Sequence, residues 1–257
     1  MGVQTISNTA ICGVVISIIL SMTVPVAFII FAKKKYQAKI STFFIGAGTF
    51  FLFAMVLEQI MHLLVIKVGG LSAENNRWLY YIYAALAAAV FEETGRIVAM
   101  KFWMKKRLDF PNALMYGIGH GGIEAILIGG LTNISNLISM LMINSGAMEQ
   151  SLAILPEETR SQTMQQLSAL WTTPASHFMA GGFERVSAII LQIGLSLLIY
   201  HALKSKKRQT AILAYALHFI VDFVAVSCAA YVSVWILEVF VLVMAVGTLL
   251  YAWRKSK

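Results

Sequence analysis

Long apolar runs, separated by short polar and basic segments, dominate the pattern of residues along the chain. A helix needs about 20 apolar residues to cross the hydrocarbon core of a bilayer. Seven segments meet this requirement, near residues 10–32, 41–66, 78–101, 112–143, 175–203, 210–231 and 233–253. The pattern therefore predicts an all-α, polytopic integral membrane helix bundle with about seven transmembrane helices, forming a single membrane-embedded domain over residues 1–257.

Composition supports this prediction and narrows the functional classes. Of the 257 residues, 59% are hydrophobic and 12% charged, whereas about one quarter of the residues in a soluble domain are charged. Cys12 and Cys228 both lie inside apolar runs, which excludes a disulfide framework and a cysteine-based zinc site. The net charge of +8 comes from short basic clusters between apolar runs. Such clusters are typical of loops at an anionic lipid bilayer, so we expect no nucleic-acid partner.

Alternate loops differ in their basic residues, and this difference predicts the orientation of the chain. Fifteen of the 20 Lys and Arg residues fall in one set of loops and three in the other. Because Lys and Arg accumulate on cytoplasmic loops, we expect an external N-terminus and a cytoplasmic C-terminus in a bacterial cell membrane. The segment at about 144–174 is then an extracytoplasmic amphipathic loop, favoured as a connector over a lid. Its apolar residues recur at helical spacing: Met164, Leu167, Leu170 and Trp171.

Ionisable residues also lie inside the predicted spans, where each costs about 2.5–3.5 kcal/mol on insertion scales. We therefore expect them to face the bundle interior and one another. They are Glu92, Glu93 and Arg96 in the third span, His120 and Glu124 in the fourth, Glu184 and Arg185 in the fifth, and His218 and Asp222 in the sixth. Spacings of three or four residues place the members of the third, fourth and sixth sets on one helix face each.

Depth in the membrane groups these residues further. Glu93, His120 and His218 each lie eight residues from the predicted cytoplasmic end of their span, which is about 12 Å at the helical rise. The three side chains are therefore expected in one layer. Glu58 and His62 in the second span, and Glu184 in the fifth, are expected in a separate, outer layer.

Paired carboxylates and two histidines in one layer suit the activation of water. A carboxylate accepts the proton of the water, and imidazoles stabilise a developing oxyanion. Arg96 would hold one of the adjacent Glu92 and Glu93 ionised and leave the other to cycle a proton, with no cofactor. The same atoms allow a zinc alternative, in which His120, His218 and Glu92 or Glu93 bind the ion and leave one position open for water.

Two alternatives come from other functional classes. A proton-coupled transporter also carries Glu, His and Asp in its spans, and a non-catalytic membrane scaffold is the other alternative. A transporter is expected to show broken helices in corresponding halves, whereas the Gly-rich segment from Gly117 to Gly122 occurs once. That segment predicts close approach of a substrate backbone or a neighbouring helix beside His120.

The motifs that carry these residues resemble a known superfamily. EETGR at 92–96, Tyr116 followed four residues later by His120, and H-x-x-x-D at 218–222 are similar to motifs of the intramembrane glutamic proteases. These include the CAAX prenyl endopeptidases, the bacteriocin-processing immunity proteins and the PrsW protease. Within the superfamily, GIGHGGIEAI and the later GGFER resemble the signature of the bacterial YhfC family, and the resemblance covers most of the chain.

The resemblance implies an endopeptidase that hydrolyses a peptide bond of a membrane-associated peptide or protein. It implies that Glu92 is the base that activates water, assisted by His120 and supported by Glu93 and Arg96. His218 and Asp222 would form or orient the oxyanion site. Glu124, Glu184 and Arg185 are accessory candidates.

The motifs also depart from the CAAX endopeptidase pattern. That pattern has three residues between the glutamate pair and its Arg, whereas here two residues separate Glu93 from Arg96. Its last motif often ends in Asn, whereas here the last motif ends in Asp222. PrsW-like members have a Lys at the two-residue spacing and an acid after the second motif, which resembles Arg96 and Glu124. The choice between Glu92 and Glu93, and whether Glu124 replaces or supplements His120, therefore stay open.

Overall fold

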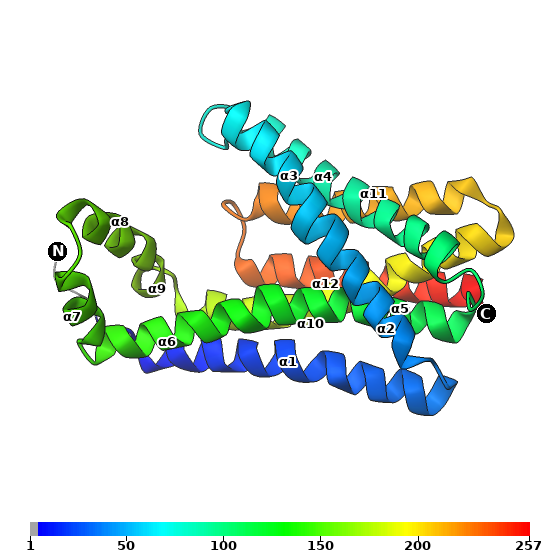
Figure 1. Ribbon diagram of the computed structural model, residues 1–257, viewed down its shortest axis with the longest axis horizontal. Coiled ribbons are helices and arrows are strands. Elements are labelled where there is room, and N and C mark those ends of the chain that lie inside the picture. Colours follow the sequence, from blue (N-terminus) through cyan, green and yellow to red (C-terminus); the bar gives the residue numbers. More distant parts are fainter. Residues whose placement is uncertain (1–4) are drawn as a thin grey trace. The chain divides into compact units, whose positions relative to one another are not determined.

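The computed structural model describes residues 5–257, and within this range it contains helices and no strands (Figure 1). The helices, with π-helical segments marked η, are α1 (Asn8–Tyr36), α2 (Ile40–Phe50), η1 (Phe51–Glu58), α3 (Gln59–His62), η2 (Leu63–Val68), α4 (Arg77–Val98), η3 (Ala99–Trp103), α5 (Phe110–Glu124), η4 (Ala125–Leu131), α6 (Thr132–Asn144), α7 (Ala147–Ala153), α8 (Glu157–Leu167), α9 (Ala169–Thr172), α10 (Ala175–Ser205), α11 (Arg208–Cys228) and α12 (Val234–Ser256). The all-α prediction is confirmed.

Several of these helices join into stretches long and apolar enough to cross a membrane. Six such stretches occur within residues 5–257: Asn8–Tyr36, Ile40–Val68, Phe110–Asn144, Ala175–Ser205, Arg208–Cys228 and Val234–Ser256. The seventh expected span corresponds to α4, whose 22 residues extend about 33 Å. Its polar residues Glu92, Glu93 and Arg96 make it less apolar than the other six. The chain is thus a multi-pass helical membrane protein, and its orientation stays a prediction.

The chain divides into two compact units by its residue contacts. The smaller unit comprises the described part of residues 1–23 together with residues 125–186, and the larger unit comprises residues 24–124 and 187–257. The divisions fall inside α1, between α5 and η4, and inside α10. The single domain expected from the sequence stays a prediction.

The smaller unit contains the segment expected to be an amphipathic loop. This segment forms α7, α8 and α9. Leu170 is buried in an apolar cluster, and Leu167 and Trp171 pack against it. The other buried members of the cluster come from the chain before and within α1 and from α6: Ile6, Ala10, Val14, Met140 and Ile143. Three of the four apolar side chains that recur at helical spacing therefore pack on protein within this unit.

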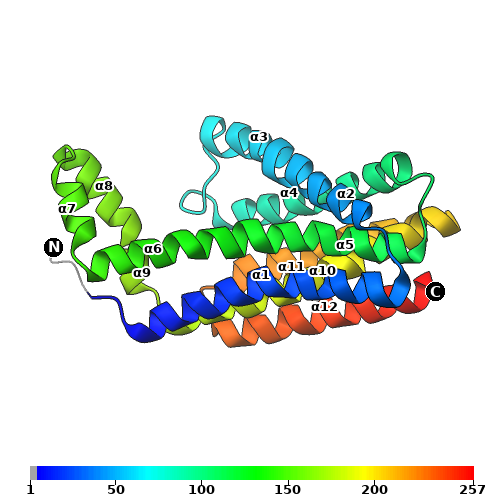
Figure 2. The ribbon, with the colours of Figure 1, turned by 60° about the horizontal axis from the view of Figure 1, so that its bottom comes forward.

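The larger unit is built on close helix crossings. Figures 1 and 2 show α2 crossing α5 and α4 lying against α11, and both pairs pack extensively. A Cβ atom at Gly46 of α2 would collide with the carbonyl oxygen of Tyr116, and one at Gly119 of α5 would collide with the carbonyl oxygen of Phe43. The Gly-rich segment thus lets a neighbouring helix approach closely, which is one of the two interpretations of that segment, and this crossing fixes α5 beside α2.

Candidate active site

Three helices of the larger unit bring the predicted polar residues together. Glu92 and Glu93 come from α4, His120 from α5 and His218 from α11. His120 Nε2 lies 2.8 Å from Glu92 Oε2, and His218 Nδ1 lies 2.8 Å from Glu93 Oε1. All four residues are buried, with Glu93 and His120 fully inaccessible. The residues expected at one depth are therefore neighbours, and the nearest carboxylate is Glu92 for His120 and Glu93 for His218.

Arg96 connects the two glutamates from the same helix. Its guanidinium donates one hydrogen bond to Glu93 Oε1 and another, of 3.3 Å, to Glu92 Oε2. The arginine is fully buried, and a buried charge is tolerated only when it is paired and hydrogen-bonded. The i, i+3 and i, i+4 spacing read from the sequence thus produces a three-residue ion cluster on one face of α4.

Gln192 of α10 is a member of the site that the sequence analysis missed. Its Oε1 accepts a hydrogen bond from Arg96, and its Nε2 donates to Glu92 Oε2 over 3.0 Å and to Glu124 Oε2 over 2.7 Å. Glu124 is thereby joined to Glu92 through an amide. The available signal was a single amide within the apolar run AIILQIGLSLL, which is unusual inside a membrane helix.

His218 faces carboxylates with both ring nitrogens. Its Nδ1 contacts Glu93, while its Nε2 lies 3.4 Å from Asp222 Oδ2 and 4.0 Å from Glu92 Oε2. Asp222, one turn further along α11, keeps 33% of its side chain accessible. The H-x-x-x-D spacing therefore places an acid at the histidine nitrogen that points toward Glu92.

Glu58 and His62 come from the second predicted span. Glu58 ends η1, which packs against α4, and its side chain is buried. His62 Nε2 lies 3.3 Å from Glu58 Oε1. The separate layer expected for Glu58 and His62 stays a prediction. Counting depth by residue number assumes parallel helices, whereas Figure 1 shows the α2-to-η2 stretch running obliquely to α5.

Glu184 and Arg185 belong to the smaller unit. The two adjacent residues form an ion pair, and a Cβ atom at Gly129 would lie 2.7 Å from Arg185 Cγ. Their side chains keep 31% and 15% of their surface accessible. Their accessory role stays a prediction.

Comparison with known proteins places the chain in a family. The profile of the YhfC intramembrane metalloproteases matches residues 20–243. The chain belongs to the YhfC family. A curated YhfC relative, described as an uncharacterized membrane protein of Bacillus subtilis strain 168, is 38% identical over 224 residues, which cover 86% of each chain. No solved structure matches the chain significantly.

The family description has a consequence for the expected chemistry. It supports an intramembrane protease in general, and it specifies a metalloprotease. That description agrees with the zinc alternative and not with the metal-free form of the prediction, and it gives no support to the glutamic type in particular.

The residues of the site supply donors that suit zinc, although they are not yet arranged around an ion. Within residues 5–257 no three His, Cys, Asp or Glu side chains have the mutual placement of a formed metal site. Two donors of one tetrahedral zinc ion lie about 3.4 Å apart. Glu92 Oε2 is 2.8 Å from His120 Nε2 and 4.0 Å from His218 Nε2. Each separation differs from the tetrahedral value by about 0.6 Å. The donor set, two imidazoles and a carboxylate, therefore suits zinc in its chemistry, while these side chains are not placed to hold an ion in this structure.

Proposed function

We propose that this chain is a zinc-dependent intramembrane endopeptidase, which cleaves a peptide bond of a membrane-associated peptide or protein. The convergence of two histidines and two glutamates from three helices carries the proposal. Such a buried polar layer is costly inside a membrane, and ionisable residues retained there mark functional sites. The description of the YhfC family supports the reaction class.

His120, His218 and Glu92 are the side chains that would hold the ion, because two imidazoles and a carboxylate leave one position open. A zinc ion in this set would polarise a water molecule and stabilise negative charge on the peptide carbonyl oxygen. Glu93 accepts a hydrogen bond from Nδ1 of His218, and this contact leaves Nε2 of the ring as the donor atom for a metal. Carboxylate–histidine contacts of this kind orient metal ligands in many zinc sites.

Glu93 is the proton acceptor in this proposal. Its Oε1 is held by Arg96 and His218, while its Oε2 is buried without a hydrogen-bond partner among residues 5–257. Glu93 Oε2 would take a proton from the attacking water as the new C–O bond forms. The carboxylic acid would then deliver this proton to the amine nitrogen as the C–N bond breaks. Gln192 and Arg96 position the two carboxylates by hydrogen bonds.

A metal-free mechanism is the second candidate, and one observation favours it. His120 contacts Glu92 directly over 2.8 Å, and both nitrogens of His218 face carboxylates. These contacts pair Nε2 of His120 and both ring nitrogens of His218 with carboxylates without an ion. In that mechanism Glu92 accepts the proton of the water and the imidazoles stabilise the oxyanion.

Two measurements test the proposal, the first on cells that express the protein and the second on the purified protein. Mass spectrometry of new protein termini in the membrane fraction detects cleavage of any membrane protein, so the substrate need not be identified beforehand. We expect termini that depend on the wild-type protein and are absent with Glu93→Gln, which retains the volume of the side chain and removes the proton acceptor. Glu157→Gln, an equivalent change at an exposed glutamate of α8, is the matched control and should leave these termini unchanged.

Elemental analysis of the purified protein separates the two mechanisms. The zinc proposal predicts about one zinc ion per chain, lost with His120→Asn and retained with His62→Asn. Wild-type protein that generates the termini while it contains no zinc would contradict the metal-dependent mechanism. The absence of any terminus that distinguishes wild type from Glu93→Gln would contradict peptide hydrolysis.

A further inference from the structure

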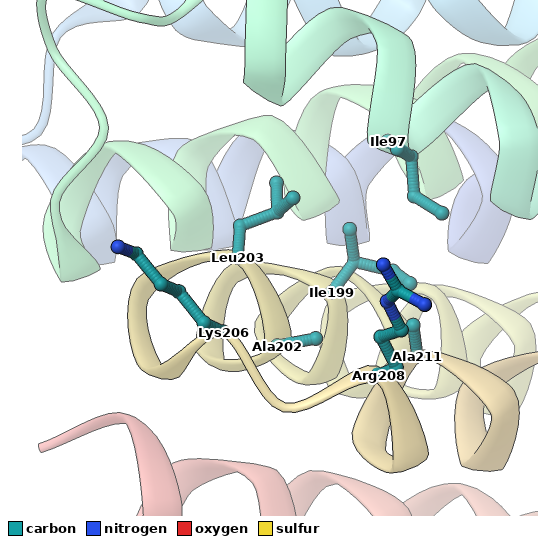
Figure 3. Close-up of a pocket in the computed structure, with 7 residues that line it drawn as sticks. All are labelled: Ile97, Ile199, Ala202, Leu203, Lys206, Arg208 and Ala211. Atoms are coloured by element: carbon teal, nitrogen blue, oxygen red, sulfur yellow. The ribbon is translucent and has the colours of Figure 1, made fainter.

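A groove lies in the larger unit where α4, α10 and α11 meet, and its lining includes none of the polar side chains of the active site. Its volume is about 330 Å³, within the usual range for small-ligand pockets. Figure 3 shows Ile97 reaching from α4 toward Ile199 of α10, with Leu203 beside them. Ala202 and Ala211 complete an apolar wall. Ile97, which lines the groove, follows Arg96 in α4. The groove therefore adjoins the helix that carries Glu92 and Glu93.

Two basic side chains lie beside this apolar wall. Lys206 and Arg208 line the groove, and its seven lining residues include no acid. In Figure 3 the Arg208 side chain extends toward Ile97 and Ile199, and Lys206 lies on the other side of Leu203. Lys207 precedes α11, whose first turn contains no acidic residue. The positive end of that helix dipole therefore adds to the side-chain charges.

The backbone conformation at Lys206, just after the end of α10, does not require a lysine side chain at this position. Lys206 has a φ of +55°, and Lys207 N–H donates to the carbonyl oxygen of Ala202 over 3.1 Å. This is the helix ending in which glycine is the preferred residue, because a Cβ atom is unfavourable at positive φ. Gln37, after α1, has the same φ of +55° and provides a matched position outside the groove.

We propose that this groove binds one anionic phospholipid of the cytoplasmic leaflet. The acyl chain packs on Ile97, Ile199 and Leu203, and the phosphate accepts hydrogen bonds from Arg208 and Lys206. Charge complementarity selects this occupant, because an apolar wall with cations at the predicted cytoplasmic ends of three helices matches a lipid with an anionic headgroup. Arginine binds phosphate through two parallel hydrogen bonds. The lipid then lies beside the α4 turn that follows Arg96.

Native mass spectrometry of the purified full-length protein, with phosphatidylglycerol and phosphatidylcholine as probes, tests this proposal. For the wild type we expect one retained phosphatidylglycerol, preferred at least about 10-fold over phosphatidylcholine, and a thermal stabilisation of roughly 3 °C or more by the anionic lipid. Lys206→Gly combined with Arg208→Gln should abolish the preference. Because glycine suits the positive φ of residue 206, loss of folding is not expected from that change. Ala202→Trp, which fills the apolar wall, should abolish retention of both lipids.

Three control variants make the outcome decisive. Gln37→Gly relieves the same backbone conformation without touching the groove, and Lys34→Gln with Lys35→Gln removes two charges from another basic cluster. Both should retain the lipid preference. Glu93→Gln should retain it as well, because lipid binding does not depend on hydrolysis. The proposal is overturned if the Lys206/Arg208 variant keeps its preference, if the Lys34/Lys35 variant loses it equally, or if inorganic phosphate alone gives the same stabilisation.

Discussion

An arginine beside glutamate occurs twice within the predicted spans, and the two clusters differ in their surroundings. Arg185 pairs with Glu184, its neighbour on the same helix, and both side chains keep part of their surface accessible. Arg96 is fully buried, and its two glutamates also contact histidines from two other helices. An ion pair with a neighbouring glutamate reduces the cost of placing an arginine in a membrane. Contacts from three helices create a set of groups that can perform chemistry.

Loss of a histidine from the Arg96 cluster should have the largest effect. His120→Asn and His218→Asn each remove one proposed metal donor, so we expect zinc content to fall below about one tenth of an ion per chain and cleavage to fall at least about 100-fold. His62→Asn, which alters a histidine that is not a proposed ligand, should retain zinc. Elemental analysis and a cleavage assay check both outcomes. Equal zinc content in His120→Asn and wild type would remove His120 from the metal site.

Replacing Gln192 should give the next largest effect. Gln192→Met keeps the length of the side chain but removes its hydrogen bonds to Glu92, Glu124 and Arg96. Residues that orient metal ligands typically contribute about 10- to 100-fold, and we expect a loss of this size in kcat with a smaller change in KM. Gln59→Met, at a glutamine whose amide donates to a backbone carbonyl, is the control. A kcat within twofold of wild type in Gln192→Met would show that the amide does not position the carboxylates.

Replacing Glu58 tests whether this carboxylate belongs to the group of residues that supports turnover. Because its carboxylate is buried on η1, which packs against the α4 helix that carries Glu92, Glu58→Gln should change turnover by about three- to tenfold, less than the change at Gln192. Glu184→Gln in the other cluster should leave turnover within twofold. Steady-state kinetics on the same substrate compares the two variants. If Glu58→Gln is as silent as Glu184→Gln, Glu58 has no part in the chemistry.

The α2–α5 crossing should affect stability more than chemistry. A methyl group at Gly46 would collide with the backbone of α5, whereas one at Gly48 meets no atom within 4 Å. We expect Gly46→Ala to destabilise the protein by about 1–3 kcal/mol and Gly48→Ala to be neutral or slightly stabilising. Thermal unfolding in detergent measures both. Equal melting temperatures would mean that the crossing is looser than the structure indicates.

Helical spacing and charge burial predicted which ionisable side chains lie together, because both act within one helix or at one depth. Glu93 and Arg96 are three residues apart on one face, and the cost of a buried charge indicates that His120 and His218 lie near them. Gln192 was missed because a lone amide has no periodic partner in the sequence. Residue counting alone could not place Glu58 relative to this cluster, because its helix runs obliquely to α5, and tilt depends on packing at residues such as Gly46 and Gly119.

The same limits explain the fold prediction. Six of the seven predicted spans stand out by hydropathy because each contains a long apolar stretch with few charged residues. The α4 helix is harder to recognise as a membrane span from its hydropathy, because Glu92, Glu93 and Arg96 make it more polar than the other spans. The division into two units could not be read from the sequence, because the divisions lie within continuous helical stretches and no linker composition marks them.

Turnover of the purified protein on a substrate identified from its new termini tests the central claim most directly. The account predicts that wild-type protein cleaves this substrate, that a zinc chelator stops cleavage and added zinc restores it, and that Glu93→Gln reduces turnover at least about 100-fold while zinc stays bound. Glu93→Gln protein that cleaves the substrate at the wild-type rate would contradict the account.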